Sequence, residues 1–285
     1  MNTETLSKLV VLSLPLITLP ACVVNSDPIE STTNTKQSTA LTQHSKSIGF
    51  GPQSPRNIDS NLGHNRLIFS PAPSANSMNL CNIHLHKNAE HKGGEFTTYA
   101  GDGDGHGYKT GYKYSGQLTA AERKPLPEAV CIGEHSAIQS GDTLEVHYVY
   151  STSQVKPGVS LGACVANPIR NPQLRVEGQV IVAVNDDNAA NFIEMAEYAV
   201  RDQYTQAINI PTDTGTPIQY AGSTTGPSYN EKDSPYQVTW SVRPKVKKVN
   251  IKSLGKWCER NVFEEDHAHG VRNLVTDPKS LSPIL

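Results

Sequence analysis

The 285-residue sequence has little charge of one sign, few aromatic side chains and no long apolar run. Its formal net charge is −2, with 18% charged residues, so it lacks the strong positive field that attracts nucleic acid. Aromatic residues make up 6%, whereas 21 Gly and 19 Pro interrupt the chain, which favours strands and loops over a helical bundle. The apolar run at residues 9–19 is far shorter than the roughly 20 residues of a membrane-spanning helix.

The first 22 residues have the features of an export signal. Lys8 precedes the apolar run, and Leu-Pro-Ala-Cys follows at residues 19–22. This ending resembles a bacterial lipoprotein signal, in which Cys22 becomes the lipidated N-terminus; ordinary secretion is the alternative. Residues 23–47 are mainly Ser, Thr, Asn, Gln and Lys and predict a flexible tether. The expected organisation is a signal peptide at 1–21, a lipidated cysteine and tether at 22–47, and one domain at 48–285.

These features predict a protein of the bacterial cell envelope, anchored to a membrane through lipidated Cys22 and facing the periplasm or the exterior. The four remaining cysteines are Cys81, Cys131, Cys164 and Cys258. Their number is even and the environment is oxidising, so disulfides are expected, in any of three pairings. No two of these cysteines have a C-x2-C spacing, which argues against a zinc–cysteine cluster.

Short alternating segments between Gly, Pro and Asn residues predict a sheet protein. They read NLCNIHLH, EFTTYAG, DTLEVHYVYS, QLRVEGQVIVAVN and YQVTWSVRPKVKKVNI. One stretch, residues 189–204, places Phe192 and Met195 at a helical interval after Asp186-Asp187, which suits an N-cap, and predicts a helix. The expected fold is mainly β (α+β), a single domain with one large, predominantly antiparallel twisted sheet and few short helices.

The stretch CNIHLHKNAEH, residues 81–91, contains two histidines on one strand face. Because side chains i and i+2 of a strand share a face, His84 and His86 present two imidazoles side by side. The same rule places Glu145 and His147 on one face of LEVHYVY. Three imidazoles from two neighbouring strands would form a zinc site with one position open for water, although cobalt or iron would also fit. Ordinary histidines on a half-buried sheet are the alternative.

Two polar residues share the strand faces of these histidines. Asn82 and Glu145 would each accept the second ring N–H of a neighbouring imidazole, which fixes the orientation of a metal ligand. Solvated strand residues are the other interpretation of both.

Further motifs give the chain a family resemblance. QSPRNID (53–59), NLGHN (61–65), HLHKNAEH, LEVHYV, VEGQVIVAV, YAGSTTGP (220–227) and VTWSV (238–242) occur in this order. The sequence thereby resembles the carbonic anhydrases, most closely the delta class in CNIHLHKNAEH, with other motifs similar to those of the alpha class. The resemblance runs from about residue 50 to the C-terminus. It implies an alpha-carbonic-anhydrase-like fold and the zinc-dependent reversible hydration of carbon dioxide to bicarbonate and a proton by a zinc-bound hydroxide.

The resemblance also implies roles for single residues. The ligands of one zinc ion would be His84, His86 and His147. Thr224 would hold the zinc hydroxide in orientation, with Thr225 as the alternative. Glu90 would accept the proton of that threonine.

The same resemblance extends to the substrate and to the released proton. Val149 and Val176 match the apolar wall against which carbon dioxide rests, and core packing is their other interpretation. His64 stands at the position of a proton relay, with His91 as the alternative, since a histidine pKa near 6.5 suits that task.

Two segments depart from the family pattern. The 60 residues between His86 and His147 contain DGDG, which predicts a glycine-rich surface turn, because no glutamate closes a calcium-binding loop there. HAH at residues 267–269 predicts a solvated loop, with an accessory metal site as the alternative.

Two other classes of protein fit part of the pattern. HLHKNAE satisfies the H-x-H-x3-E spacing of a cupin-type metal-binding protein, in which Glu90 would be a direct metal ligand, but Thr97 replaces the expected glycine. A non-catalytic envelope protein that binds metal is the third interpretation. Coordination of metal by Glu90 would favour the cupin. The oligomeric state does not follow from the sequence.

Overall fold

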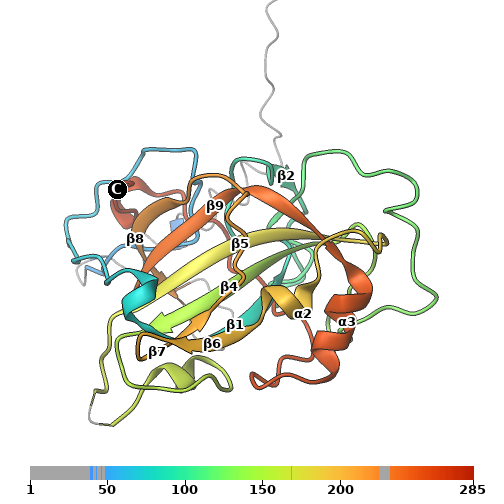
Figure 1. Ribbon diagram of the computed structural model, residues 1–285. Helices are drawn as coiled ribbons and strands as arrows, with labels where there is room; N and C mark the ends of the chain where they lie inside the picture. The colour runs from blue at the N-terminus through green and yellow to red at the C-terminus, as the bar shows by residue number, and fades with distance from the viewer. Residues whose placement is uncertain (1–38, 41–42, 44–45, 47–48, 168, 225–231) are drawn as a thin grey trace, which may run out of the picture.

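The centre of the computed structural model, which describes residues 39–40, 43, 46, 49–167, 169–224 and 232–285, is a five-stranded sheet. Its strands lie side by side (Figure 1) in the order β1 (Asn79–Lys87), β4 (Thr143–Ser151), β5 (Leu174–Val184), β9 (Tyr236–Asn250) and β8 (Ile218–Thr224). The β5–β9 pair is parallel, and the other three pairs are antiparallel. The predicted mainly β, mostly antiparallel architecture is therefore confirmed.

Smaller elements surround this sheet. The two-stranded pairs are β2 (Thr98–Tyr99) with β3 (Tyr112–Lys113), and β6 (Tyr198–Arg201) with β7 (Tyr204–Ala207). The helices are α2 (Phe192–Met195), α3 (Ile251–Glu259) and the 3-10 turns η1 (Ala75–Ser77), η2 (Leu161–Cys164) and η3 (Pro278–Ser280). Among the described residues, no helix combines the length and apolar character needed to cross a membrane.

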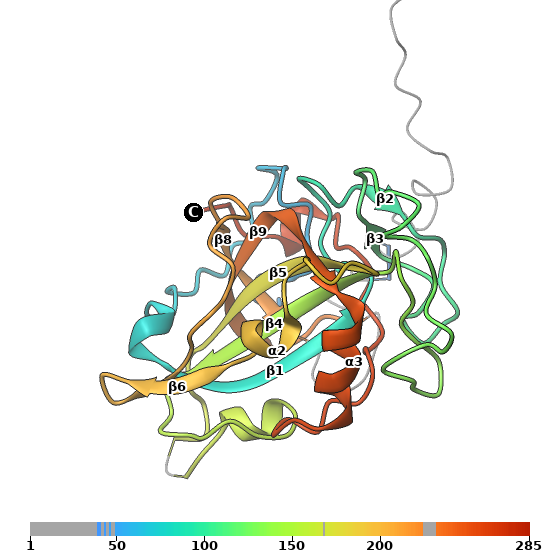
Figure 2. The same ribbon diagram turned by 45° about the vertical axis from the view of Figure 1, so that its right-hand side comes forward.

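The strand period of two separates the faces of the sheet. Ile83 and Leu85 of β1 pack with Leu254 and Trp257 of α3 in one buried core, and Figure 2 shows α2 and α3 lying over the sheet. The residues that alternate with Ile83 and Leu85 along β1, including His84, point to the opposite face. The helices thus cover one face and leave the other for the histidines.

The predicted helix over residues 189–204 is wrong beyond one turn. Helix α2 has four residues and is capped by Asn191, whose side chain accepts a backbone N–H at 3.0 Å, rather than by the aspartates before it. The rest of the stretch leads into the β6–β7 hairpin. Its turn residues, Asp202 and Gln203, have φ angles of 47° and 76°, as a two-residue hairpin turn of type I′ requires. Turn chemistry therefore overrides the helical spacing.

A helix that the sequence pattern did not predict follows β9 directly. The side chain of Asn250 accepts the backbone N–H of Lys252 at 2.8 Å and caps the start of α3. Leu254, Trp257 and Cys258 lie on the buried side of α3. No Gly or Pro separates the last residues of β9, Lys245 to Val249, from the cap, so the sequence marks no boundary there.

The cysteines form two disulfides, Cys81–Cys164 and Cys131–Cys258. Disulfide formation is confirmed, and the fold supplies the pairing that the sequence left open. Cys81–Cys164 joins β1 to η2, and Cys131–Cys258 joins the loop before β4 to α3.

Candidate metal centre

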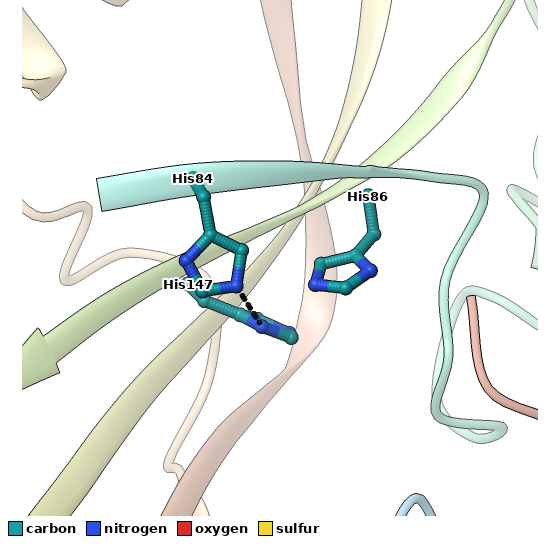
Figure 3. A group of neighbouring side chains, drawn as sticks. All are labelled: His84, His86 and His147. Atoms are coloured by element: carbon teal, nitrogen blue, oxygen red, sulfur yellow. Dashed lines mark hydrogen bonds between the residues drawn. The ribbon is translucent and has the colours of Figure 1, made fainter. Parts of the chain in front are cut away.

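Three histidines converge on the face of the sheet opposite the helices. The register of β1 and β4 places His84 directly opposite His147, and His86 opposite Glu145. His84 and His86 both project from β1 toward His147 (Figure 3). One ring nitrogen from each histidine lies within 4.8 Å of the other two. In the described part of the chain, this is the group of side chains that could hold a metal ion.

Hydrogen bonds fix which nitrogens face the centre. His84 Nδ1 donates to Asn82 Oδ1 at 2.6 Å, and His86 Nδ1 donates to the carbonyl oxygen of Gly270 at 3.0 Å. Both rings therefore turn Nε2 toward the centre. In His147 the two nitrogens exchange these roles. Its Nε2 is hydrogen-bonded to Glu145, and its Nδ1 faces the centre, 3.2 Å from His84 Nε2. Three imidazole nitrogens within 4.8 Å of one another match a donor set of zinc.

A buried carboxylate holds the third ring. Glu145 is fully buried, and its Oε1 accepts from His147 Nε2 at 3.1 Å and from His91 Nδ1 at 2.7 Å. Its Oε2 accepts the backbone N–H groups of Glu90 and His91 at 2.7 and 3.2 Å. Burial alone would raise the pKa of Glu145, yet the charges and hydrogen bonds of His91 and His147 hold this pKa well below its usual value. Glu145 is therefore an ionised anchor for the site.

The same network removes His91 from contact with solvent. His91 is fully buried, and its Nε2 accepts a hydrogen bond from the Tyr220 hydroxyl at 2.5 Å. Both of its ring nitrogens are thus engaged. A buried ring held at both nitrogens does not have the access to water that the alternative relay role demands.

The histidines of β1 are in the protonation state that metal binding needs. Burial, with a contribution from His147, lowers the pKa of His84 well below its usual value. Burial likewise lowers the pKa of His86 to about 4, although Glu90 opposes the shift. Both imidazoles are neutral at pH 7, and a neutral imidazole offers the lone pair that a cation binds. The residues present thus fit a zinc ion.

Thr224 and Glu90 line the same cavity as the histidines, and its volume is about 730 Å³. Glu90 Oε1 accepts the backbone N–H of Arg272 at 3.0 Å. Among the described residues, no hydrogen bond joins Glu90 to Thr224, and Thr225 lies outside the described residues. The structure thus brings both predicted residues to the cavity without the predicted contact between them.

Glu90 is not placed as a metal ligand. Its Oε1 lies 3.6 Å from His86 Nδ1, which is the nitrogen bonded to Gly270 and not the free one. The carboxylate is also absent from the group of convergent ligand atoms. This placement argues against the cupin-type arrangement, in which Glu90 would coordinate the metal.

The two valines lie in the core beside the metal centre. Val149 and Val176 are directly opposite each other on β4 and β5 and are 1% and 3% exposed. They belong to the core that contains Trp240, whose ring lies 4.9 Å from the ring of His147. Neither valine is among the cavity-lining residues. Their role as a substrate wall stays a prediction.

His64 is not brought to the cavity. Its side chain is exposed, and its backbone N–H and its Nδ1 both contact the carbonyl oxygen of Pro278, at 2.9 and 3.0 Å. It is not among the residues that line the cavity. The NLGH segment contacts η3 instead. The motif match therefore did not predict where the His64 side chain lies relative to the cavity.

Sequence reasoning missed His269, for which a solvated loop was predicted. The Lys87 N–H donates to the His269 carbonyl at 2.8 Å, and the His269 N–H donates to the Leu85 carbonyl at 2.7 Å. The ring lines the cavity, 6.0 Å from the ring of His84, and a hydrogen bond to Glu265 raises its pKa. A single residue that bridges to a strand shows no alternating pattern in the sequence. The only signal for His269 was therefore the H-x-H spacing with His267.

The segment between the second and third ligands adds histidines to the cavity. His106 and His135 both line it and stack with ring centroids 4.7 Å apart. His106 follows the DGDG turn, where Gly103 and Gly105 have φ angles of 84° and 86°. Positive φ angles suit glycine, and the predicted glycine-rich turn is confirmed.

Three imidazoles from two antiparallel strands line one cavity, and their second nitrogens are hydrogen-bonded to other groups. They form a candidate metal site of the three-histidine class. The model of the delta carbonic anhydrase family matches residues 75–253, which is more than half of the chain. The protein belongs to the delta carbonic anhydrase family and is an enzyme of the carbonic anhydrase type.

Solved structures were compared as well. A hyperthermostable carbonic anhydrase from an active hydrothermal vent chimney is 15% identical, with a TM-score of 0.29 over 84% of this chain and 88% of that one. The Photobacterium profundum alpha-carbonic anhydrase is 13% identical, with a TM-score of 0.27 over 86% and 94%. A halotolerant carbonic anhydrase from Dunaliella salina is 18% identical, with a TM-score of 0.27 over 50% and 51%. A comparison with curated sequences finds no significant match. The assignment therefore rests on the family model.

Proposed function

We propose that the protein catalyses the zinc-dependent reversible hydration of carbon dioxide to bicarbonate and a proton. The observation that carries this proposal is the set of three imidazoles, each with one ring nitrogen within 4.8 Å of the other two. Zinc bound there would supply a hydroxide nucleophile at neutral pH, because it lowers the pKa of a bound water to about 7. Carbon dioxide and bicarbonate are then the substrate and product, and one zinc ion per chain is the cofactor.

Removal of the metal tests this proposal. The purified protein should contain about one zinc ion per chain and should accelerate carbon dioxide hydration in a stopped-flow assay. Chelation should remove the activity, and added zinc should restore it. A zinc-loaded protein that hydrates carbon dioxide no faster than buffer would contradict the proposal and favour the non-catalytic metal-binding protein.

Thr224 is proposed to orient the nucleophile, with Glu90 as the acceptor of its hydroxyl proton. Support comes from the position of both side chains in the wall of the cavity that contains the histidines. The Glu90 carboxylate is held in place by the Arg272 N–H. Apo structures often show such catalytic hydrogen bonds long or unformed until the site is occupied.

Replacement of Thr224 by valine should lower kcat/KM about 100-fold, the usual effect of removing one hydrogen-bonding group that stabilises the transition state. Zinc content should stay unchanged, because Thr224 is not a ligand in this proposal. The measurement is stopped-flow hydration beside metal analysis. An unaltered kcat/KM would remove Thr224 from the mechanism and return Thr225 as the candidate.

We further propose that the protein is a lipoprotein of the bacterial envelope, anchored through Cys22. The support is the Leu-Pro-Ala-Cys ending of the export signal at residues 19–22 and the polar stretch after it. Cys22 lies outside the described residues. Metabolic labelling with a fatty acid should mark the wild-type protein and not Cys22→Ala. Equal labelling of both would exclude the anchor.

A further inference from the structure

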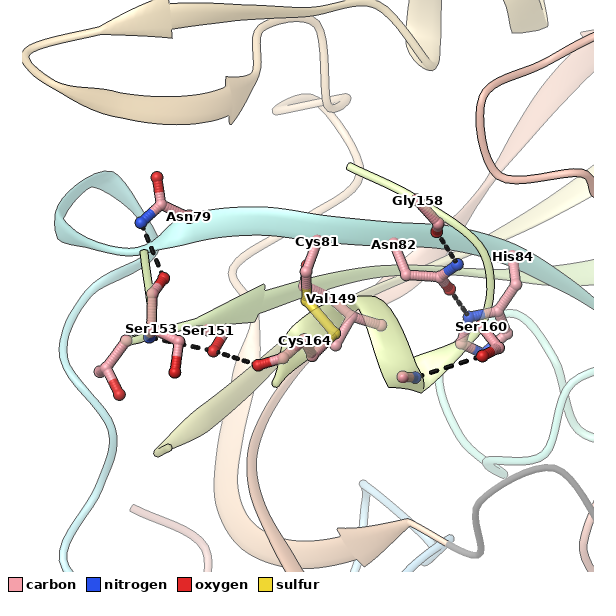
Figure 4. The surroundings of a disulfide bond; sticks show 12 residues. Asn79, Cys81, Asn82, His84, Val149, Ser151, Ser153, Gly158, Ser160 and Cys164 are labelled. Carbon is pink, nitrogen blue, oxygen red and sulfur yellow. Dashed lines mark hydrogen bonds between the residues drawn. A yellow bond between two sulfur atoms is a disulfide. The ribbon is translucent and has the colours of Figure 1, made fainter. Parts of the chain in front are cut away.

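The Cys81–Cys164 disulfide begins at an irregular point of β1. The register with β4 shifts between Leu80 and Asn82, which leaves Cys81 as the extra residue of a bulge. A bulge re-aims a side chain out of the strand alternation. Cys81 thereby reaches Cys164, with both cysteines fully buried and their Cα atoms 5.0 Å apart (Figure 4).

This disulfide fixes one wall of the cavity. The wall segment, residues 158–162, precedes Cys164, and its last three residues, Ser160, Leu161 and Gly162, line the cavity. Two hydrogen bonds attach the segment to β1, and the disulfide attaches the chain to β1 just after it, at Cys164. The Gly158 N–H donates to the Cys81 carbonyl at 3.0 Å, and Asn82 Nδ2 donates to the Gly158 carbonyl at 3.1 Å.

The same asparagine reaches the metal centre. The Asn82 amide donates to Gly158 through Nδ2 and accepts from His84 Nδ1 through Oδ1, at 2.6 Å. Both bonds appear in Figure 4 as one chain from the wall segment to the ligand ring. Asn82 is 1% exposed, so no bulk water replaces a lost partner. The amide plane, and with it the His84 ring, is set by the position of Gly158.

We propose that the Cys81–Cys164 disulfide is a positioning element of the metal centre. It holds Gly158 against Asn82, and Asn82 holds the His84 ring with Nε2 directed toward His86 and His147. Without the disulfide, the wall segment moves, Asn82 loses its fixed donor contact and His84 is no longer preorganised. The inference rests on the proposed function in taking zinc as the ion.

The second disulfide provides a matched control. Cys131–Cys258 lies in the core on the helix-covered face, and its cysteines are 127 residues apart, against 83 for Cys81–Cys164. Loop-closure entropy depends only weakly on loop length, so the two disulfides restrict the unfolded chain to a similar degree. Removal of either should lower the thermal midpoint similarly, which separates stability from positioning.

The experiment compares C81A/C164A, C131A/C258A, N82A and N82A combined with C81A/C164A. Zinc affinity is measured by competition with a chelator, without carbon dioxide, at a temperature where thermal scans show each protein folded. C81A/C164A and N82A should each weaken zinc binding about 10- to 100-fold, as expected when an outer partner of a ligand is lost. Their visible spectra with Co²⁺ should change in the same way. C131A/C258A should keep the wild-type affinity and spectrum.

The combined variant decides whether the disulfide acts through Asn82. The losses of residues in one network do not add, so the combination should bind zinc no more weakly than N82A. Multiplied losses, or a C81A/C164A protein with wild-type zinc affinity, would overturn the proposal.

A second route covers a C81A/C164A protein that does not fold. In zinc-loaded C131A/C258A, reduction by a phosphine opens Cys81–Cys164 without substituting it, and zinc release should accelerate at least about 10-fold. Unchanged release from the reduced protein would also overturn the proposal. A wild-type protein that binds zinc but fails to hydrate carbon dioxide would refute the proposed function and leave this inference standing.

Discussion

Replacing His147 with alanine should abolish tight zinc binding and lower kcat/KM for carbon dioxide hydration about a thousandfold or more. A thousandfold loss corresponds to about 4 kcal/mol of transition-state stabilisation. His147 is the ligand from β4, with its ring centroid 5.0 Å from that of His84 and 4.5 Å from that of His86. Two imidazoles on one strand remain in the variant, which is too few for a closed set of three protein ligands.

Metal analysis measures the zinc content of His147→Ala, and stopped-flow hydration of carbon dioxide measures its kcat/KM. His64→Ala serves as the control for zinc content, because its ring is exposed and outside the cavity. It should bind one zinc ion as the wild type does. Wild-type activity in His147→Ala would refute the assignment of the metal centre.

The second large effect is expected for Glu145→Gln. The carboxylate accepts four hydrogen bonds, two of them from the backbone N–H groups of Glu90 and His91. An amide places an NH2 group where an acceptor is needed and removes the charge beside His91. Breaking such a buried pair costs about 3–5 kcal/mol of unfolding free energy. Zinc affinity should fall about 10- to 100-fold as well, because His147 loses its fixed orientation.

The effect of Glu145→Gln on stability should depend on pH. The folded-state pKa of Glu145 lies well below its unfolded value, so its contribution is present above about pH 4.5 and is lost as the pH falls toward the folded pKa. The stability difference between wild type and Glu145→Gln should therefore shrink on acidification. Urea unfolding at neutral and acidic pH measures it. Glu194→Gln, on the exposed side of α2, should track the wild type at both pH values.

The parts of the site that follow from the period of a strand could be predicted from the sequence. The rule that residues i and i+2 share a face placed His84 with His86, and Glu145 with His147, before any register was known. Hydrophobic alternation likewise identified the long strands. These predictions succeed because side-chain direction in a strand is a local property.

The parts that failed depend on contacts between distant segments. His269 reaches the cavity through a single bridge to β1, which leaves no periodic signal. His64 matched a motif, but its segment lies along η3. The helix predicted over residues 189–204 gave way to a hairpin whose turn, at Asp202 and Gln203, lies inside the predicted range. Disulfide pairing was also open, since it is a property of the folded chain.

The position of β1 at the end of the sheet has a consequence for solubility. An outermost strand presents unpaired backbone groups that invite strand addition from another molecule, a common start of aggregation. Here both ends of the strand carry such bonds, since the Gly158 N–H donates to the Cys81 carbonyl at one end and His269 bonds to Leu85 and Lys87 at the other. The segments that complete the cavity thus also shield the strand that carries two of the histidines from intermolecular β-pairing.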